Sequence, residues 1–184
     1  MHFYCQLDYE HVPYLSPMGV ANGNLANNGC GVCAASMLIE SLLNIPFPPE
    51  ECAVFSKRCG AREGYGTNFY ILAGALAARF DLTMRPTEDI GAVTEALRNG
   101  ARVIANTQGD REGYTGVFSD SGHYLLLDKI RGSEICVYDP MYRPGRYDVP
   151  GRIGKVRMDG NAAWADLNVI REDCMDRPYF IFTV

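Results

Sequence analysis

The chain has 184 residues, of which 47% are hydrophobic and 21% are charged, a composition typical of a globular domain. This apolar content excludes a mainly disordered protein, and no apolar run reaches the roughly 20 residues of a membrane-spanning helix. Lys and Arg number 17 against 22 Asp and Glu, so no extended basic surface for nucleic acid is expected. The one mild basic cluster is interpreted as a solvated loop and comprises Arg143, Arg146, Arg152, Lys155 and Arg157.

The cysteine content bears on the compartment. There are seven cysteines, and an odd number excludes a complete framework of intrachain disulfides. Several lie in apolar stretches, as Cys136 does, where a free thiol behaves as a small buried hydrophobe. Because free thiols persist in reducing compartments, we expect a cytoplasmic protein. The N-terminus has no signal-peptide pattern, so a secreted protein is the alternative only if such a peptide has been removed.

The chain opens with a segment rich in Tyr, Asn, Gly and Pro, residues 1–29, which is predicted to be an extended lead-in. A helix is then predicted over residues 30–43. Apolar side chains cover nearly every face of it, and a helix of that kind is buried. Asn27 or Asn28 can cap its N-terminus, and Asn44 ends it.

Three further helices are predicted, over residues 48–58, 68–80 and 89–99. The first of them begins in a Pro-Pro-Glu-Glu sequence, which is typical of a first helical turn. The second follows a loop over residues 60–66 and has Thr67 as its expected cap.

After these helices the pattern changes to strands, predicted over residues 101–107, 123–131 and 134–138. A long loop rich in Gly, Ser and Asp, residues 108–122, separates the first strand from the second. The second and third strands are expected to form a hairpin with a two-residue turn at Gly132-Ser133.

The tail is predicted to be irregular over residues 139–163, helical near residues 164–171 and a buried strand over residues 178–184. Helices that precede strands favour an α+β fold with a mostly antiparallel sheet, on which the buried helix over residues 30–43 would pack. We expect a single domain over residues 1–184.

The sharpest local motif is Asn-Gly-Cys-Gly-Val-Cys around Cys30, at the start of the buried helix. Backbone N–H groups are unpaired there and the helix dipole stabilises an anion, so both favour a thiolate. Gly29 and Gly31 leave room for a substrate backbone to approach the thiol. The alternative is a buried cysteine that simply starts a helix.

The candidate partners of Cys30 come from the hairpin. His123 begins one strand and Asp139 follows the next, so the two residues are expected to be neighbours at the open end. An Asp beside a His orients the ring and stabilises the imidazolium. The alternative is a strand-end His with an Asp-Pro turn. The other histidines, His2 and His11, lie in the lead-in and are expected to be exposed polar residues.

Taken together, these motifs resemble the bacteriocin-processing, double-glycine-leader type of cysteine peptidase and its stand-alone relatives in the papain-like superfamily. The resemblance covers most of the chain, about residues 3–140 and more loosely the tail, with the motifs in the family's order. The matching segments are Tyr4-Cys5-Gln6-Leu7-Asp8-Tyr9, Gly29-Cys30-Gly31 with Ala35-Ser36-Met37, Gly64-Tyr65-Gly66-Thr67, Ala77 to Leu82, Ile90 to Asn106, Gly122-His123-Tyr124 and Tyr138-Asp139-Pro140.

The resemblance implies a fold, an activity and roles. It implies a papain-like cysteine peptidase, of bacterial type, that hydrolyses a peptide or protein substrate without a cofactor or metal. Cys30 would be the nucleophile, His123 the general base and acid, and Asp139 the residue that orients His123. Gln6 would supply an oxyanion-hole donor together with the Cys30 N–H. No membrane insertion or nucleic acid is implied, and nothing about oligomeric state.

The chain departs from the family pattern at two points. It has Val32-Cys33 where relatives commonly have Pro-Thr or Pro-Ser, which places a second thiol one helical turn from Cys30. Gln6 also lies much farther before Cys30 than the Gln of the leader peptidases does. This wider spacing fits the stand-alone relatives better.

Several alternatives stay open. The Cys30-x-x-Cys33 spacing also occurs in thiol–disulfide oxidoreductases, and Cys52 and Cys59 could add to the pair in a zinc site. A papain-like acyltransferase would use the same acyl-enzyme, and a non-catalytic relative could bind peptides. The loop over residues 108–121 could be a lid, a specificity wall or an ordinary exposed connection.

Overall fold

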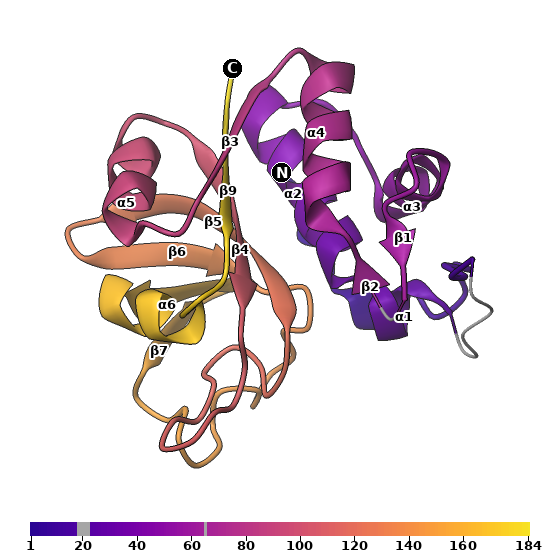
Figure 1. Ribbon diagram of the computed structural model, residues 1–184. Coiled ribbons are helices and arrows are strands. Elements are labelled where there is room, and N and C mark those ends of the chain that lie inside the picture. The colour runs from indigo at the N-terminus through magenta and orange to yellow at the C-terminus, as the bar shows by residue number, and fades with distance from the viewer. Residues whose placement is uncertain (18–22, 65) are drawn as a thin grey trace.

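The fold is built on a large antiparallel sheet with helices on both faces (Figure 1). The computed structural model describes residues 1–17, 23–64 and 66–184. Within these residues seven strands pair in the order β3-β9-β4-β5-β6-β8-β7, and every neighbouring pair is antiparallel. The expected α+β class with a mostly antiparallel sheet is therefore confirmed.

The buried helix is α2, Cys30–Leu43, with the predicted bounds. It packs on the sheet mainly against β5, and Asn44 ends it in the left-handed conformation. The expected capping by Asn27 or Asn28 is wrong, because both belong to a short helix α1, Leu25–Asn28, that abuts α2 through Gly29. The lead-in is thus partly helical, including a 3-10 turn η1, Gln6–Asp8; its residues 18–22 lie outside the described part.

The next two helices, α3 at Pro49–Arg58 and α4 at Phe69–Phe80, are confirmed. Asn68, rather than Thr67, caps α4 by accepting the Ile71 N–H. Thr67 instead ends a two-residue strand β2, Gly66–Thr67, which pairs with β1, Arg62–Glu63, inside the predicted loop. Such a pair is too short to leave a periodic signal, and Tyr65 between the strands lies outside the described residues.

The central elements follow the predicted order: α5 at Ile90–Arg98, β4 at Arg102–Thr107, β5 at His123–Arg131 and β6 at Glu134–Tyr138. The final strand β9, Tyr179–Thr183, is also confirmed. The edge strand β3, Thr83–Thr87, was not predicted. It contains a Pro and is mostly exposed, as is common at the edge of a sheet.

The tail differs most from the prediction. Residues 156–166 form a hairpin of β7, Val156–Asp159, and β8, Ala162–Asp166, and the last helix, α6, spans Leu167–Asp173. Trp164 therefore lies in a strand, where it pairs with Cys136 of β6. The Ala-rich sequence of β8 favours a helix by propensity alone, and pairing with β6 overrides that preference.

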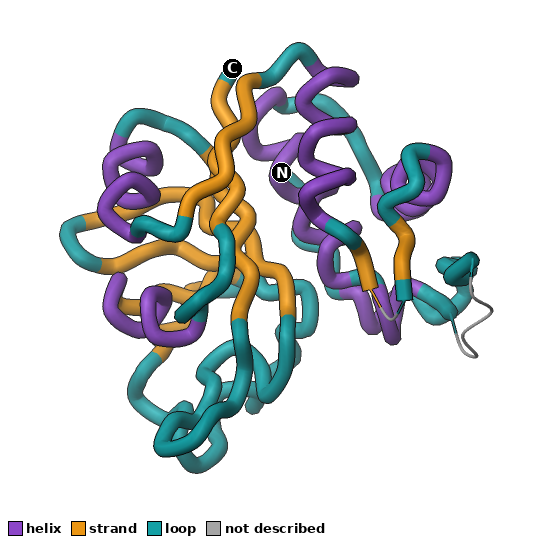
Figure 2. The backbone as a smooth tube through the Cα atoms, viewed as in Figure 1, coloured by secondary structure: helices purple, strands orange, loops and turns teal. Residues whose placement is uncertain are grey.

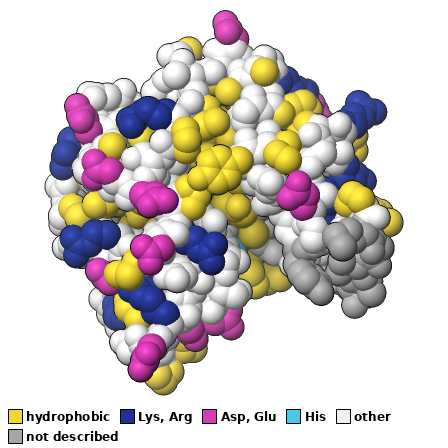
Figure 3. All heavy atoms as spheres, in the orientation of Figure 1, with side chains coloured by type: hydrophobic (Ala, Val, Ile, Leu, Met, Phe, Trp, Pro, Cys, Tyr) yellow, Lys and Arg dark blue, Asp and Glu magenta, His cyan; other side chains and the backbone are white. Residues whose placement is uncertain are grey.

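The sheet is covered on both faces (Figure 2). Helices α2 and α4 bury one face, which includes Ile104 of β4, whereas α5 and α6 bury the other, which includes Val103. Figure 3 shows hydrophobic side chains gathered over the junction between the sheet and the helices α2–α4. None of the helices in the described ranges is both long and apolar enough to cross a membrane.

Candidate active site

Cys30 is the first residue of α2 and is held there by close backbone packing. A Cβ on Gly29 would lie 2.4 Å from the Leu25 carbonyl oxygen, and a Cβ on Gly31 would lie 3.2 Å from the side chains of Thr67 and Tyr124. The space beside the two glycines is thus filled by the protein itself. The expectation that they admit a substrate backbone is wrong; they let α1, α2 and β5 approach one another.

The Cys30 thiol is polarised by its neighbours. Burial raises its pKa, but a hydrogen bond with His123, the charge of that ring and the backbone N–H groups of Tyr124 and Gly31 outweigh it. The pKa of Cys30 is therefore held below its ordinary value. One turn along the same helix, burial, reinforced by the negative charges of neighbouring thiols and Glu50, keeps the pKa of Cys33 well above its ordinary value.

His123 and Asp139 meet at the open end of the β5–β6 hairpin, as predicted. His123 Nε2 lies 2.7 Å from Asp139 Oδ1, and the two residues are 3% and 1% exposed. The hairpin turns at Gly132-Ser133 as expected, and a bulge between Leu127 and Lys129 shifts its register. Because Nε2 faces the carboxylate, Nδ1 is the ring nitrogen left for Cys30.

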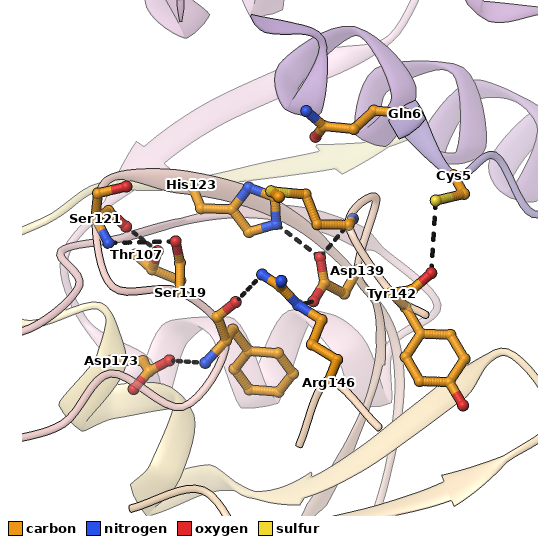
Figure 4. A network of polar contacts seen from close by, with 12 residues as sticks. Cys5, Gln6, Thr107, Ser119, Ser121, His123, Asp139, Tyr142, Arg146 and Asp173 are labelled. Carbon is orange, nitrogen blue, oxygen red and sulfur yellow. Dashed lines mark hydrogen bonds and ion pairs between the residues drawn. The ribbon is translucent and has the colours of Figure 1, made fainter. Parts of the chain in front are cut away.

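Asp139 is bound on both oxygens (Figure 4). Oδ1 accepts from His123 and from the Met141 N–H at 2.8 Å, while Oδ2 accepts from Arg146 Nε and Tyr147 OH at 2.7 Å each. Burial alone would raise the pKa of Asp139, but His123, Arg146 and Tyr147 outweigh it and lower the pKa to about 2. The carboxylate is therefore charged throughout the physiological range.

The same interactions set the charge of His123. Burial disfavours the imidazolium, but the carboxylate of Asp139 and the Cys30 sulfur outweigh burial and raise the pKa of His123 to about 9. With the pKa of Cys30 lowered, the pair is expected to rest as thiolate and imidazolium. That charge state is the one in which a cysteine is a strong nucleophile.

Gln6 lies in η1 beside the start of α2 and is 2% exposed. Its backbone N–H donates to the Pro140 carbonyl at 2.7 Å, and its Nε2 donates to the Ala26 carbonyl at 2.8 Å. The second hydrogen on Nε2 is not used by that bond. Within the described residues its Oε1 is buried without a hydrogen-bond partner.

Of the four candidate residues, all but Asp139 line one cavity of about 370 Å³. Its lining is predominantly polar and consists of Gln6, Asn27, Cys30, Ser119, Asp120, Ser121, Gly122, His123, Met141, Arg146 and Arg152. Cys30, Gln6 and His123 share this cavity, and Asp139 lies directly behind His123. The structure thus brings together all of the residues that the resemblance singled out.

Two lining residues were misjudged from the sequence. Arg146 and Arg152 were assigned to a solvated loop, but Arg146 bonds Asp139 and Arg152 donates from Nε to the Gly116 carbonyl at 2.9 Å. No local pattern distinguishes them from the exposed Arg143. Their roles follow only from the path of residues 139–152 past the end of the hairpin.

The loop before His123 is not an ordinary exposed connection. Val117 and Phe118 are buried, and their N–H groups donate to the buried carboxylate of Asp173 at 2.8 Å each. Ser119 to Gly122 then form one side of the cavity. These ties favour a fixed wall over a moving lid.

The Cys-x-x-Cys alternative finds little support in this geometry. All seven cysteines lie in described residues and each is a free thiol. The helix that carries Cys30 follows another helix, whereas oxidoreductases of this kind place the motif after a strand. Cys33, one helical turn after Cys30, lies in the hydrophobic core and does not line the cavity.

The comparisons with known proteins show the fold. No protein-family model matches the sequence, and no curated protein matches it. A protein from Bacillus anthracis described as a C39-like peptidase has a TM-score of 0.56 and 10% identity, over 95% of this chain and 96% of its own. The peptidase domain of Streptococcus ComA, a bi-functional ABC transporter involved in quorum sensing, has a TM-score of 0.55 and 8% identity, over 84% of this chain and 90% of its own. The chain therefore has the papain-like fold of the C39-like peptidases, as the sequence motifs predicted.

Proposed function

We propose that residues 1–184 form a single-domain cysteine peptidase that hydrolyses a peptide or amide bond. The observation that carries the proposal is the hydrogen-bonded chain from Cys30 through His123 to Asp139 at the wall of one polar cavity. A lowered thiol pKa beside a raised imidazole pKa is what nucleophilic acyl transfer requires. The two similar solved structures are described as peptidases, which supports the same activity.

In the proposed reaction the Cys30 thiolate attacks the carbonyl carbon and forms a tetrahedral oxyanion. The Cys30 N–H and the free Nε2 hydrogen of Gln6 donate to that oxygen, since the first N–H groups of a helix have no partner within it. His123 gives its Nδ1 proton to the leaving amine as the C–N bond breaks. It then takes a proton from water, which cleaves the thioester and releases the Cys30 thiolate.

The first test is alkylation by substoichiometric iodoacetamide between pH 5 and 9, with the adduct located by peptide mass spectrometry. We expect Cys30 to react ahead of the other thiols already near pH 6, and to lose that advantage in His123→Ala. Cys59 is the matched internal control, because it is similarly exposed but donates to the Ser56 carbonyl. A Cys30 that reacts no faster than Cys59, or that is disulfide-bonded to Cys33, would refute the proposal.

Gln6 is tested separately from the nucleophile. Gln6→Ala is expected to lower kcat on a cleaved peptide by about 10²–10³, the usual effect of losing one oxyanion donor. Alkylation forms no oxyanion, so Cys30 should stay as reactive in this variant as in wild type. If kcat and the alkylation rate of Cys30 fell equally, Gln6 would instead maintain the structure of the site.

The acyltransferase alternative shares every step up to the thioester. It is distinguished by adding an amine acceptor to the peptide reaction and identifying the products by mass spectrometry. A peptidase yields the free acid as its main product, whereas a transferase yields the new amide.

A further inference from the structure

Arg146 connects the candidate triad of Cys30, His123 and Asp139 to the loop that precedes His123. Its Nε donates to Asp139 Oδ2 at 2.7 Å, and its Nη2 donates to the Phe118 carbonyl at 2.5 Å (Figure 4). The side chain is 15% exposed. Because the guanidinium is planar and rigid, the two donors hold their acceptors at a fixed separation.

Phe118 is held from the other direction as well. Its N–H donates to Oδ2 of Asp173, the last residue of α6, and the neighbouring Val117 N–H donates to Oδ1. Asp173 is fully buried. The backbone at residue 118 is thus clamped between two charged side chains, just before the segment that forms the cavity wall and leads into His123.

On the triad side, Arg146 shares Asp139 Oδ2 with the hydroxyl of Tyr147. Together with the Met141 N–H, which donates to Oδ1 at 2.8 Å, these two donors determine how the carboxylate is rotated. With Oδ2 occupied, Oδ1 is directed at His123 Nε2. The direction of that bond determines where the other ring nitrogen, and hence its proton, lies relative to Cys30.

We infer that Arg146 is a positioning residue, which aligns the Asp139 carboxylate with His123 and locks that pair to the cavity wall formed by residues 119–122. This inference rests on the proposed peptidase function. The role inferred for Arg146 is one of geometry more than of charge, because His123 and Tyr147 also lower the pKa of Asp139.

Arg146→Lys separates geometry from charge. A lysine keeps the positive charge but has one nitrogen, so it cannot bond Asp139 and the Phe118 carbonyl with the arrangement of the guanidinium fork. If the carboxylate loosens, the imidazolium of His123 loses part of its support. The pKa of His123 should then fall from about 9, and the pKa of Cys30 should rise.

The experiment measures two pH profiles for wild type and Arg146→Lys: iodoacetamide alkylation of Cys30, and kcat and KM on a peptide that wild type cleaves. We expect kcat to fall about tenfold to a hundredfold with KM nearly unchanged, as for a small misplacement of a catalytic group. The acidic limb of the alkylation profile, which reports the pKa of Cys30, should move to higher pH by about one unit. The alkaline limb of the hydrolysis profile, which reports the pKa of His123, should move to lower pH by about one unit. A purely structural role would lower stability and move neither limb.

Arg152→Lys is the matched control. Arg152 lies on the same segment, lines the same cavity and anchors the same loop through Gly116, and no contact with Asp139 is seen among the described residues. In Arg152→Lys the limbs of the alkylation and hydrolysis pH profiles should stay where they are in wild type. Tyr147→Phe removes the other bond to Oδ2 while the loop tie remains, and should move the limbs in the same direction as Arg146→Lys. It decides the question if Arg146→Lys does not fold.

The inference would be overturned if both Arg146→Lys and Tyr147→Phe kept the pH profiles and the kcat of wild type. It would also be overturned if Arg152→Lys shifted the pH profiles as much as Arg146→Lys does. In each of these cases the wild-type enzyme still shows a reactive Cys30. Failure of the proposed function is distinguishable, because wild-type Cys30 would then react no faster than Cys59, and the inference would fall with it.

Discussion

The two sides of the candidate site are held by different kinds of interaction. On the helical side, Cys30 and Gln6 are placed by backbone contacts: Gly29 against Leu25, and the Gln6 N–H on the Pro140 carbonyl. On the sheet side, His123 and Asp139 are placed by buried charges and their hydrogen bonds. Backbone packing does not titrate, whereas buried ion pairs do, so the two sides should fail under different perturbations.

The same contrast occurs within α2. Cys30 and Cys33 lie one turn apart on one helix, yet the pKa of Cys30 is lowered and that of Cys33 is raised. Both are near the positive end of the helix dipole, so the dipole alone does not make a thiolate. The difference comes from His123, which the sheet contributes.

The largest expected effect comes from breaking the sheet side. Asp139→Asn should destabilise the protein by about 3–5 kcal/mol, because the substitution leaves buried donors without their anion. It should also abolish the reactivity advantage of Cys30. Urea unfolding and alkylation measure the two effects.

The control for that loss is Asp128→Asn. Asp128 is also a nearly buried carboxylate, paired with Arg102 at 2.8 Å and accepting from Ser41, but it lies away from the cavity. The Asp128→Asn variant should be less stable than wild type, while its Cys30 keeps its reactivity. If Asp128→Asn slows alkylation as much as Asp139→Asn does, the effect is one of global stability and the comparison of the two sides is refuted.

Breaking the helical side is expected to cost less. In Gly29→Ala the new methyl group would overlap the Leu25 backbone, which cannot rotate away, so about 1–3 kcal/mol of stability should be lost. Gly74→Ala on α4 meets nothing within 4 Å and should be neutral or stabilising by up to about 1 kcal/mol. Thermal unfolding of the two variants tests this, and an equal response would contradict the packing argument.

The pH dependence of stability sharpens the comparison further. The pKa of Asp139 is lowered to about 2, so its contribution is present above pH 4 and is lost as pH falls toward 2. The pKa of His123 is raised to about 9, so its contribution is full below pH 6.5 and is lost as pH rises through 9. Urea midpoints at pH 6 and pH 9.5 should differ more in wild type than in His123→Ala. If the midpoints differed by the same amount in both proteins, a group other than His123 would be responsible for the pH dependence.

The smallest effect is expected at Cys33. Cys33→Ala removes a buried sulfur from the core and should cost about 1 kcal/mol. Alkylation of Cys30 and peptide cleavage should continue, since Cys33 takes no part in the proposed chemistry. Loss of activity in Cys33→Ala, with retained folding by circular dichroism, would favour the redox alternative.

Much of the fold follows from local patterns. The bounds of α2 follow from its continuous apolar faces, and the β5–β6 hairpin follows from its two-residue turn at Gly132-Ser133. The missed elements are short segments. Strands β3 and β8 pair with strands distant in the sequence, and β7 joins the sheet only through its hairpin with β8. The residues of β3 and β8 carry little alternation, and β7 alternates over only four residues, so tertiary pairing decided their conformation.

The sequence by itself determined that Cys30 begins a buried helix and that His123 and Asp139 meet at the end of a hairpin, because each depends on spacing within one element or one tight turn. The tertiary structure alone decided that these two parts face each other, that Gln6 returns to the same cavity, and that Arg146 and Asp173 hold the loop and the carboxylate. These contacts join segments separated by many residues, and a local pattern encodes neither the distance nor the direction between such segments.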